Sequence, residues 1–279
     1  MSDHDREGGE SLIVSSADQL LRPATRRGFV RMLGIGGSIV LMPSIFSACS
    51  NDDNKNTTGT NGGTGAITLD LRTDVGIFRL VQIQEVVEAT FYSAVVSATN
   101  FTTLFSSADE RELFTDLRNV EVIHRRFVET ALGAQAIPDF SAQFNQTTVN
   151  SLLASRDSIV MAARMLETQG LAALNGAGKY LKNVNNLLLA GKAASVEGRH
   201  LAALRDIAPV PSGTTANTAF AGDDTIDSNG RDVKLEATTV LARVKAVNIF
   251  NETFEQRLTI TAPDAAQGAA SADFFPAGL

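Results

Sequence analysis

Apolar residues recur at steps of three and four along four long segments of the chain, the spacing that gathers them on one face of an α-helix. The four helices predicted from this pattern span residues 75–96, 107–133, 149–175 and 180–207. A break near Ser155 is expected in the third helix and a bend near Asn186 in the fourth. A shorter fifth helix is expected over residues 232–250.

Cap and turn residues separate these segments and indicate the fold class. Ser107 precedes an acidic turn, as helix N-caps often do, and the run Asn175–Gly178 predicts a turn between the third and fourth helices. Only residues 257–261 alternate with period two. We therefore expect an all-α fold, a four-helix bundle with one long crossover between its second and third helices, followed by a shorter C-terminal helix and an irregular tail.

Ionisable side chains interrupt the apolar faces where a core is expected. Burial of a carboxylate without a partner costs several kcal/mol, so each interruption requires compensation. In chain order these residues are Glu85, Glu121, His124, Glu167, Glu197 and His200.

Their order is Glu, Glu-x-x-His, Glu, Glu-x-x-His, which is the ligand pattern of di-iron and di-manganese carboxylate bundles. Residues three apart share a helix face, so the Glu and His of each pair point toward one place. Glu85 and Glu121 lie 36 positions apart and Glu167 and Glu197 lie 30 apart, which suits two helical hairpins that each cross a metal layer twice. For either pair alone an exposed ion pair is the competing interpretation, but the full set predicts a site for two metal ions.

Composition agrees with a folded helical body and disfavours one class of partner. Hydrophobic residues make up 44% of the chain, enough to fill a core. The formal net charge is −7, so nucleic acid is not an expected partner. The chain has one cysteine, Cys49, and therefore no intrachain disulfide.

The first 48 residues are typical of an export signal. Arg26 and Arg27 open a stretch that resembles the twin-arginine motif of bacteria, and an apolar segment at 32–46 follows. That segment is shorter than the roughly 20 residues of a membrane-spanning helix but suits a signal peptide. Residues 46–49 resemble a lipoprotein cleavage box, in which the thiol of Cys49 would receive the lipid.

Residues 50–65 contain no apolar side chain and predict a flexible tether after Cys49. A short buried helix with an ordinary free thiol is the competing interpretation, and it explains neither the Arg pair nor the tether. We expect four parts: a signal peptide at 1–48, an anchor and tether at 49–69, the bundle at 70–210, and a region at 211–279 that packs on the bundle. The predicted location is the periplasm or cell envelope, with membrane attachment through the lipid.

Four short stretches carry a resemblance to a known family: Gln84–Tyr92, Glu121–His124, Leu166–Gly170 and Val196–His200. They are similar to the ferritin-like domain family, and more narrowly to its secreted, often Tat-exported branch, which includes desiccation-related proteins. The resemblance covers about residues 70–207 and, loosely, the tail at 274–276.

The resemblance implies a role for each residue of the pattern. Glu85 and Glu167 would be single-carboxylate ligands, Glu121 and Glu197 bridging or terminal carboxylates, and His124 and His200 the imidazole ligands. Tyr92 stands where many ferritin-like sites have a tyrosine near the metals, with a core aromatic as the equal alternative. Glu88 shares the face of Glu85 and would be a neighbour of the ligands, or the ligand in place of Glu85.

The expected function is redox chemistry at two iron or manganese ions, acting on O₂, peroxide or Fe(II), as in an oxidoreductase of the ferroxidase or peroxide-scavenging kind. The alternative is a non-catalytic lipoprotein for envelope stress or desiccation, with a structural metal or none. A substrate-binding lipoprotein would require an α/β body, which the helical pattern opposes. The sequence leaves open the native metal, the electron donor and whether the chain forms a homodimer.

Overall fold

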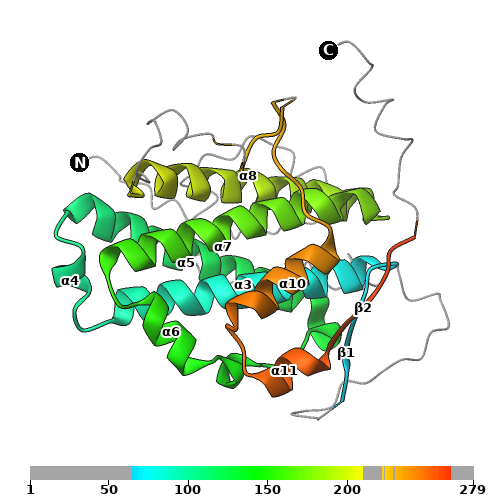
Figure 1. Ribbon diagram of the computed structural model, residues 1–279. Helices are drawn as coiled ribbons and strands as arrows, with labels where there is room; N and C mark the ends of the chain where they lie inside the picture. The colour runs from blue at the N-terminus through cyan, green and yellow to red at the C-terminus, as the bar shows by residue number, and fades with distance from the viewer. Residues whose placement is uncertain (1–64, 210–221, 223, 229, 265–279) are drawn as a thin grey trace, which may run out of the picture. The chain divides into compact units, whose positions relative to one another are not determined.

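The computed structural model describes residues 65–209, 222, 224–228 and 230–264. Helices dominate this part of the chain, which confirms the predicted all-α class apart from one short pair of strands (Figure 1). Among the described helices, none has both the length and the apolar character needed to span a bilayer. Arg26, Arg27 and Cys49 lie outside the described residues, so the export signal and lipid anchor stay predictions.

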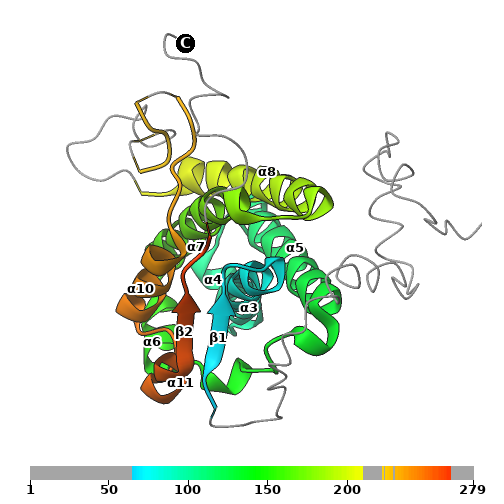
Figure 2. The ribbon, with the colours of Figure 1, turned by 90° about the vertical axis from the view of Figure 1, so that its right-hand side faces the viewer.

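Four long helices form the bundle: α3 (Asp74–Ser97), α5 (Ala108–Leu132), α7 (Arg156–Ala177) and α8 (Val184–Ile207). Helix α3 packs along α5, α7 packs along α8, and α3 also contacts α7. Figure 2 views the bundle from another side, with α3 beside α5 and α7 beside α8. A single turn, α4 (Phe101–Leu104), lies between α3 and α5.

Side-chain caps set where the long helices begin. Ser107 caps α5 as predicted, its hydroxyl accepting from the backbone of Glu110. The expected break near Ser155 is also present: α6 (Gln146–Leu152) ends before it, and Ser155 caps α7. The fourth helix begins at Val184 rather than at residue 180, because the 3₁₀ turn η4 (Gly178–Tyr180) precedes it and Asn183 supplies its cap.

A buried carboxylate joins the starts of two helices that are distant in sequence. Asp74, the first residue of α3, accepts hydrogen bonds from the backbone N–H groups of Lys182 and Asn183 at 2.7 and 3.1 Å. The side-chain amide of Asn186 donates a third bond at 2.8 Å. These bonds satisfy donors at the start of α8 that have no partner within the helix, and they fix α3 against α8.

Hydrogen bonds from α3 and aromatic contacts from the C-terminal region hold the crossover between α5 and α7. Gln82 of α3 uses both ends of its amide on Ile137, donating to the carbonyl at 2.9 Å and accepting from the N–H at 2.8 Å. Further along, Phe140 stacks on Phe254 at 5.0 Å between ring centroids, and Phe144 contacts Phe250 at the same distance. The aromatic contacts join the crossover to the C-terminal helices.

The C-terminal region forms two short helices where one was expected. Helix α10 (Ala237–Val247) stops at Asn248, whose φ of 54° lies in the left-handed region that ends helices, and α11 (Glu252–Arg257) follows. The chain before α10 packs tightly on α7. Leu235 donates to the carbonyl of Ala172 at 2.8 Å, and a Cβ added at Gly176 would lie 1.8 Å from the carbonyl oxygen of Leu235.

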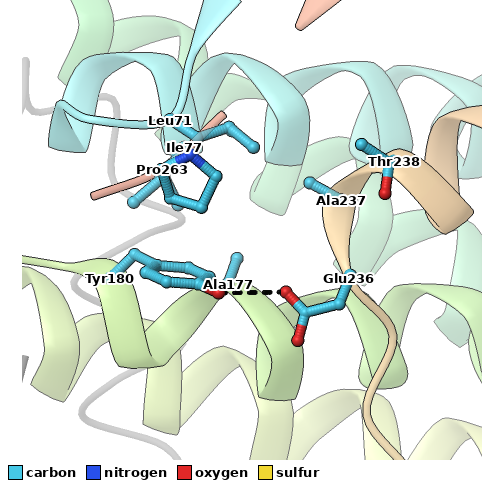
Figure 3. A pocket seen from close by; sticks show the side chains of 8 residues that line it. All are labelled: Leu71, Ile77, Ala177, Tyr180, Glu236, Ala237, Thr238 and Pro263. Carbon is cyan, nitrogen blue, oxygen red and sulfur yellow. Dashed lines mark hydrogen bonds between the residues drawn. The ribbon is translucent and has the colours of Figure 1, made fainter. Parts of the chain in front are cut away.

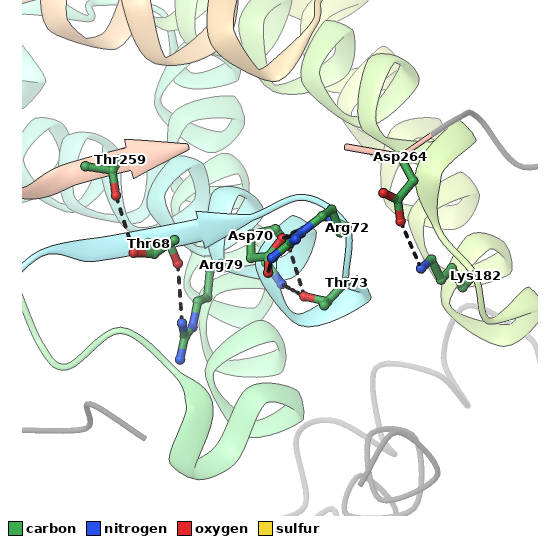
Figure 4. Close-up of polar contacts among 9 residues, drawn as sticks. Thr68, Asp70, Arg72, Thr73, Arg79, Lys182, Thr259 and Asp264 are labelled. Carbon is green, nitrogen blue, oxygen red and sulfur yellow. Dashed lines mark hydrogen bonds and ion pairs between the residues drawn. The ribbon is translucent and has the colours of Figure 1, made fainter. Parts of the chain in front are cut away.

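A parallel pair of strands, β1 (Ile67–Asp70) and β2 (Leu258–Thr261), joins the two ends of the described chain in the register Ile67↔Leu258. The period-two pattern at 257–261 corresponds to β2. Residues 67–69 were expected in the tether, but they form β1, and Leu69 is fully buried. Figure 4 shows Thr68 beside Thr259, and the Lys182–Asp264 ion pair nearby at 3.5 Å.

Candidate metal centre

The six residues of the Glu and Glu-x-x-His pattern come together between the four long helices. Their four carboxylates are buried, at 0 to 3% exposure, although burial of a carboxylate costs free energy. The two imidazoles are the more accessible members, with side-chain exposures of 17% for His124 and 11% for His200. Each helix therefore turns its ionisable residues inward, as the 3.6-residue period predicts.

The side chains form two groups that share two members. Glu85 and His124 meet Glu121 and Glu197 in the first group, and Glu167 and His200 meet the same two carboxylates in the second. Within each group the ligand atoms lie within 4.8 Å of one another. Each group has two ligands of its own, which come from two different helices, while Glu121 and Glu197 belong to both groups.

Distances between individual atoms show the sharing directly. The Nδ1 atom of His124 lies 3.3 Å from Oε2 of Glu121 and 3.2 Å from Oε1 of Glu197. The Nδ1 atom of His200 lies 2.9 Å from the other oxygen of Glu121. The two oxygens of Glu121 thus face different imidazoles, as expected of a carboxylate placed between two cations.

Most of the converging atoms have no hydrogen-bond partner. These buried atoms are Oε2 of Glu85, both carboxylate oxygens of Glu121 and Glu197, Oε2 of Glu167, and Nδ1 of His124 and His200. Buried polar atoms are almost always paired in folded proteins; these eight face one another without hydrogen-bond geometry, an arrangement that cations between them would satisfy. Carboxylate oxygens with imidazole nitrogens and no thiolate suit iron or manganese, and four carboxylates balance the charge of two divalent cations. The residues present fit a dimetal site.

The pKa values of the ligand residues indicate which of them carry protons when no cation is bound. Burial raises the pKa of the Glu85 carboxyl to about 8 despite the nearby His124. Burial would also raise the pKa of Glu121, but the two imidazoles lower it to about 2. Burial lowers the pKa of His200, yet Glu121 and Glu167 raise it to about 10. The raised pKa of His200 beside the lowered pKa of Glu121 favours a protonated imidazole when no metal is bound, and a cation would compete with that proton.

Tyr92 lies against the ligand set rather than only in the apolar core. Its hydroxyl donates to Oε1 of Glu167 at 2.6 Å, and its side chain is fully buried. Burial and the neighbouring Glu167 raise the pKa of the phenol well above its usual value, so the hydroxyl remains a donor. The hydrogen bond leaves the other oxygen of Glu167 facing His200 at 3.3 Å.

Tyr92→Phe is expected to weaken binding of the metal held by Glu167 and His200 by about 10–100-fold, because ligands lose affinity when the group that orients them is removed. Titration against a competing chelator measures this. Tyr180 is the matched control, since its hydroxyl also donates to a glutamate, Glu236, at 3.1 Å (Figure 3). A Tyr180→Phe variant that loses as much affinity would contradict the role of Tyr92.

Glu88 belongs to neither four-residue group, whereas Glu85 belongs to one, which favours Glu85 as the ligand on α3. Glu88 is nevertheless fully buried, and the amide of Gln84 donates to its Oε1 at 2.9 Å. Gln169 donates in turn to Gln84 at 3.2 Å. A Cβ at Gly170 would lie 3.0 Å from Oε1 of Glu88, so the glycine makes room for this carboxyl.

Gln84, Gln169 and Gly170 lie in the stretches that resemble the ferritin-like family but were given no role at the site, although two amides on apolar helix faces were a signal that could have found them. A separate small cavity, shown in Figure 3, lies between the β1–α3 turn, η4 and the start of α10. It is lined by Leu71, Ile77, Tyr180 and Glu236, among others, and by none of the six ligand residues.

Comparison with known families and proteins gives one match. Residues 73–209, which begin at the cap of α3 and end just after α8, match the family model described as ferritin-like domain. No curated protein and no solved structure matches the chain.

Proposed function

Since residues 73–209 belong to the ferritin-like domain family, we propose that the protein binds two iron or manganese ions between α3, α5, α7 and α8 and performs redox chemistry on O₂, peroxide or Fe(II). One observation carries the proposal: two groups of ligand atoms share Glu121 and Glu197, and most of their buried oxygens and nitrogens lack any other partner. Bound iron or manganese would supply the exchange of electrons with a small molecule.

The chain's own residues have distinct parts in this proposal. Glu121 and Glu197 would hold both ions close together, because each belongs to both groups. Glu85 with His124 would complete one position and Glu167 with His200 the other. Burial of all four carboxylates keeps bulk water from the centre, which strengthens every electrostatic interaction inside it.

We further propose that the domain works outside the cytoplasm, attached to a membrane. The support is the sequence alone: the Arg26–Arg27 pair, the apolar segment at 32–46 and the lipobox ending at Cys49. Globomycin-sensitive processing, or loss of membrane attachment in Cys49→Ser, would support this location. A soluble cytoplasmic product that is never cleaved would contradict it.

Elemental analysis of the full chain, purified without added metal or chelator, tests the metal centre. We expect about two iron or manganese ions per chain, as in the di-iron and di-manganese carboxylate bundles. A folded protein that stays free of metal, even after anaerobic incubation with Fe(II) or Mn(II), would exclude the redox function and favour a non-catalytic envelope protein.

A further inference from the structure

A narrow crevice between α3 and α7 reaches the metal centre from one side. Leu80 and Val81 of α3 and Leu174 of α7 form part of its walls, and the carboxylates of Glu85 and Glu197 also line it. Oxygen Oε2 of Glu85 and both oxygens of Glu197 are buried without a hydrogen-bond partner. The crevice therefore borders two residues of the metal centre, whose unpartnered oxygens are buried beneath its apolar surface.

The two halves of the centre differ at equivalent positions of their helices. Tyr92 stands seven residues after Glu85 on α3, and its hydroxyl donates a hydrogen bond to Glu167 in the other half. Seven residues after Glu167 on α7 stands Leu174, which has no polar atom and lines the crevice beside Glu85. The half that contains Glu85 and His124 is therefore the one that the crevice meets.

The size and lining of the crevice restrict what can enter. Its volume is about 10 Å³, close to the roughly 10–15 Å³ that one water-sized molecule requires. Small residues of α7, Gly170, Ala173 and Ala177, provide this space, and the other lining residues are Leu80, Val81, Leu174, Gln84, Glu85 and Glu197. A hydrated cation is larger than this volume and would have to shed its water shell to enter. The partly exposed imidazoles of His124 and His200 lie on other helices, α5 and α8, and do not line the crevice.

We propose that this crevice admits a small neutral oxidant, O₂ or hydrogen peroxide, to the half of the centre formed by Glu85 and His124. The inference rests on the proposed function and narrows it: the oxidant and the metal ions reach the centre by different routes. Val81, which is half-buried on the crevice wall, is the position at which the route can be narrowed without touching a ligand.

Val81→Phe tests the route in the full chain loaded anaerobically with Fe(II). We expect the oxidation rate with O₂ and with H₂O₂, mixed in separate stopped-flow experiments, to fall at least about tenfold. Binding of nitric oxide, a neutral diatomic, should slow to a similar extent, which reports access independently of turnover. The iron content should stay that of the wild type. Slowing with only one of the two oxidants would identify that oxidant as the one that uses the crevice.

Val96→Phe is the matched control, because it makes the same substitution at another half-buried valine of α3 that does not line the crevice. Ala173→Leu fills the space from α7 and serves if Val81→Phe does not fold. Unchanged rates with both oxidants and with nitric oxide in an iron-replete variant would overturn the crevice proposal alone. A wild-type chain that binds neither iron nor manganese would overturn the proposed function and this inference with it.

Discussion

Glu121→Gln is expected to remove both metal ions, whereas Glu85→Gln is expected to remove only one. Glu121 presents one oxygen toward His124 at 3.3 Å and the other toward His200 at 2.9 Å, so both positions depend on it. Glu85 belongs to one group. Glutamine keeps the volume of the side chain but replaces an anionic oxygen by an amide donor, and we expect affinity to fall by at least about 10–100-fold at each affected position. Elemental analysis of the two variants measures the difference.

Glu129→Gln provides the control for this pair. Glu129 lies on α5 two turns after Glu121, is half-buried and pairs with Arg125 at 3.5 Å, but it belongs to neither group. It should retain the full metal content. If Glu121→Gln kept one ion, or if Glu85→Gln lost both while its helical circular dichroism was unchanged, the assignment of shared and single ligands would be wrong.

Gly176→Ala is expected to lower the free energy of unfolding by about 3 kcal/mol, the upper part of the usual range for overpacking. The added Cβ would lie 1.8 Å from the backbone oxygen of Leu235, and a backbone atom cannot rotate away as a side chain does. The segment before α10 must therefore shift, with loss of its hydrogen bond to Ala172. Urea unfolding, followed by circular dichroism, measures the change.

The same substitution at Gly191 should act in the opposite direction. Gly191 lies within α8, is exposed, and a Cβ there would meet nothing within 4 Å. Alanine is a better helix former than glycine by up to about 1 kcal/mol, so Gly191→Ala should raise stability. Equal effects of the two substitutions would show that helix propensity, and not the contact with Leu235, decides the result at Gly176.

The long helices could be predicted because their period is repeated over six or more turns. The bounds of α3 and α5 agree with the expected 75–96 and 107–133 within one residue at each end. The short helices α4, α6 and α11 span four to seven residues, too few for a periodic pattern to emerge. Strand β1 was not predicted because its four residues form a strand only by pairing with β2. That partner is distant in sequence: Thr259 lies 192 positions from Ile67.

The candidate site shows the same division between local pattern and long-range arrangement. Spacing along each helix was enough to predict that Glu121 lies beside His124 and that the four helices meet at one layer. Which amide bonds to which carboxyl depends on how α3 and α7 are rotated against each other, so the chain from Gln169 through Gln84 to Glu88 could not be predicted. The binding of metal ions, their number and their identity stay predictions.

The parallel strands give the fold a definite order of assembly. The hairpins α3–α5 and α7–α8 connect neighbours in sequence and can form early, whereas β1 must wait for β2 near the other end of the chain. Closing so long a loop costs entropy that the earlier helical contacts have already reduced. We therefore expect strand pairing to be a late folding step, which completes the domain only after residues 258–261 have been synthesised.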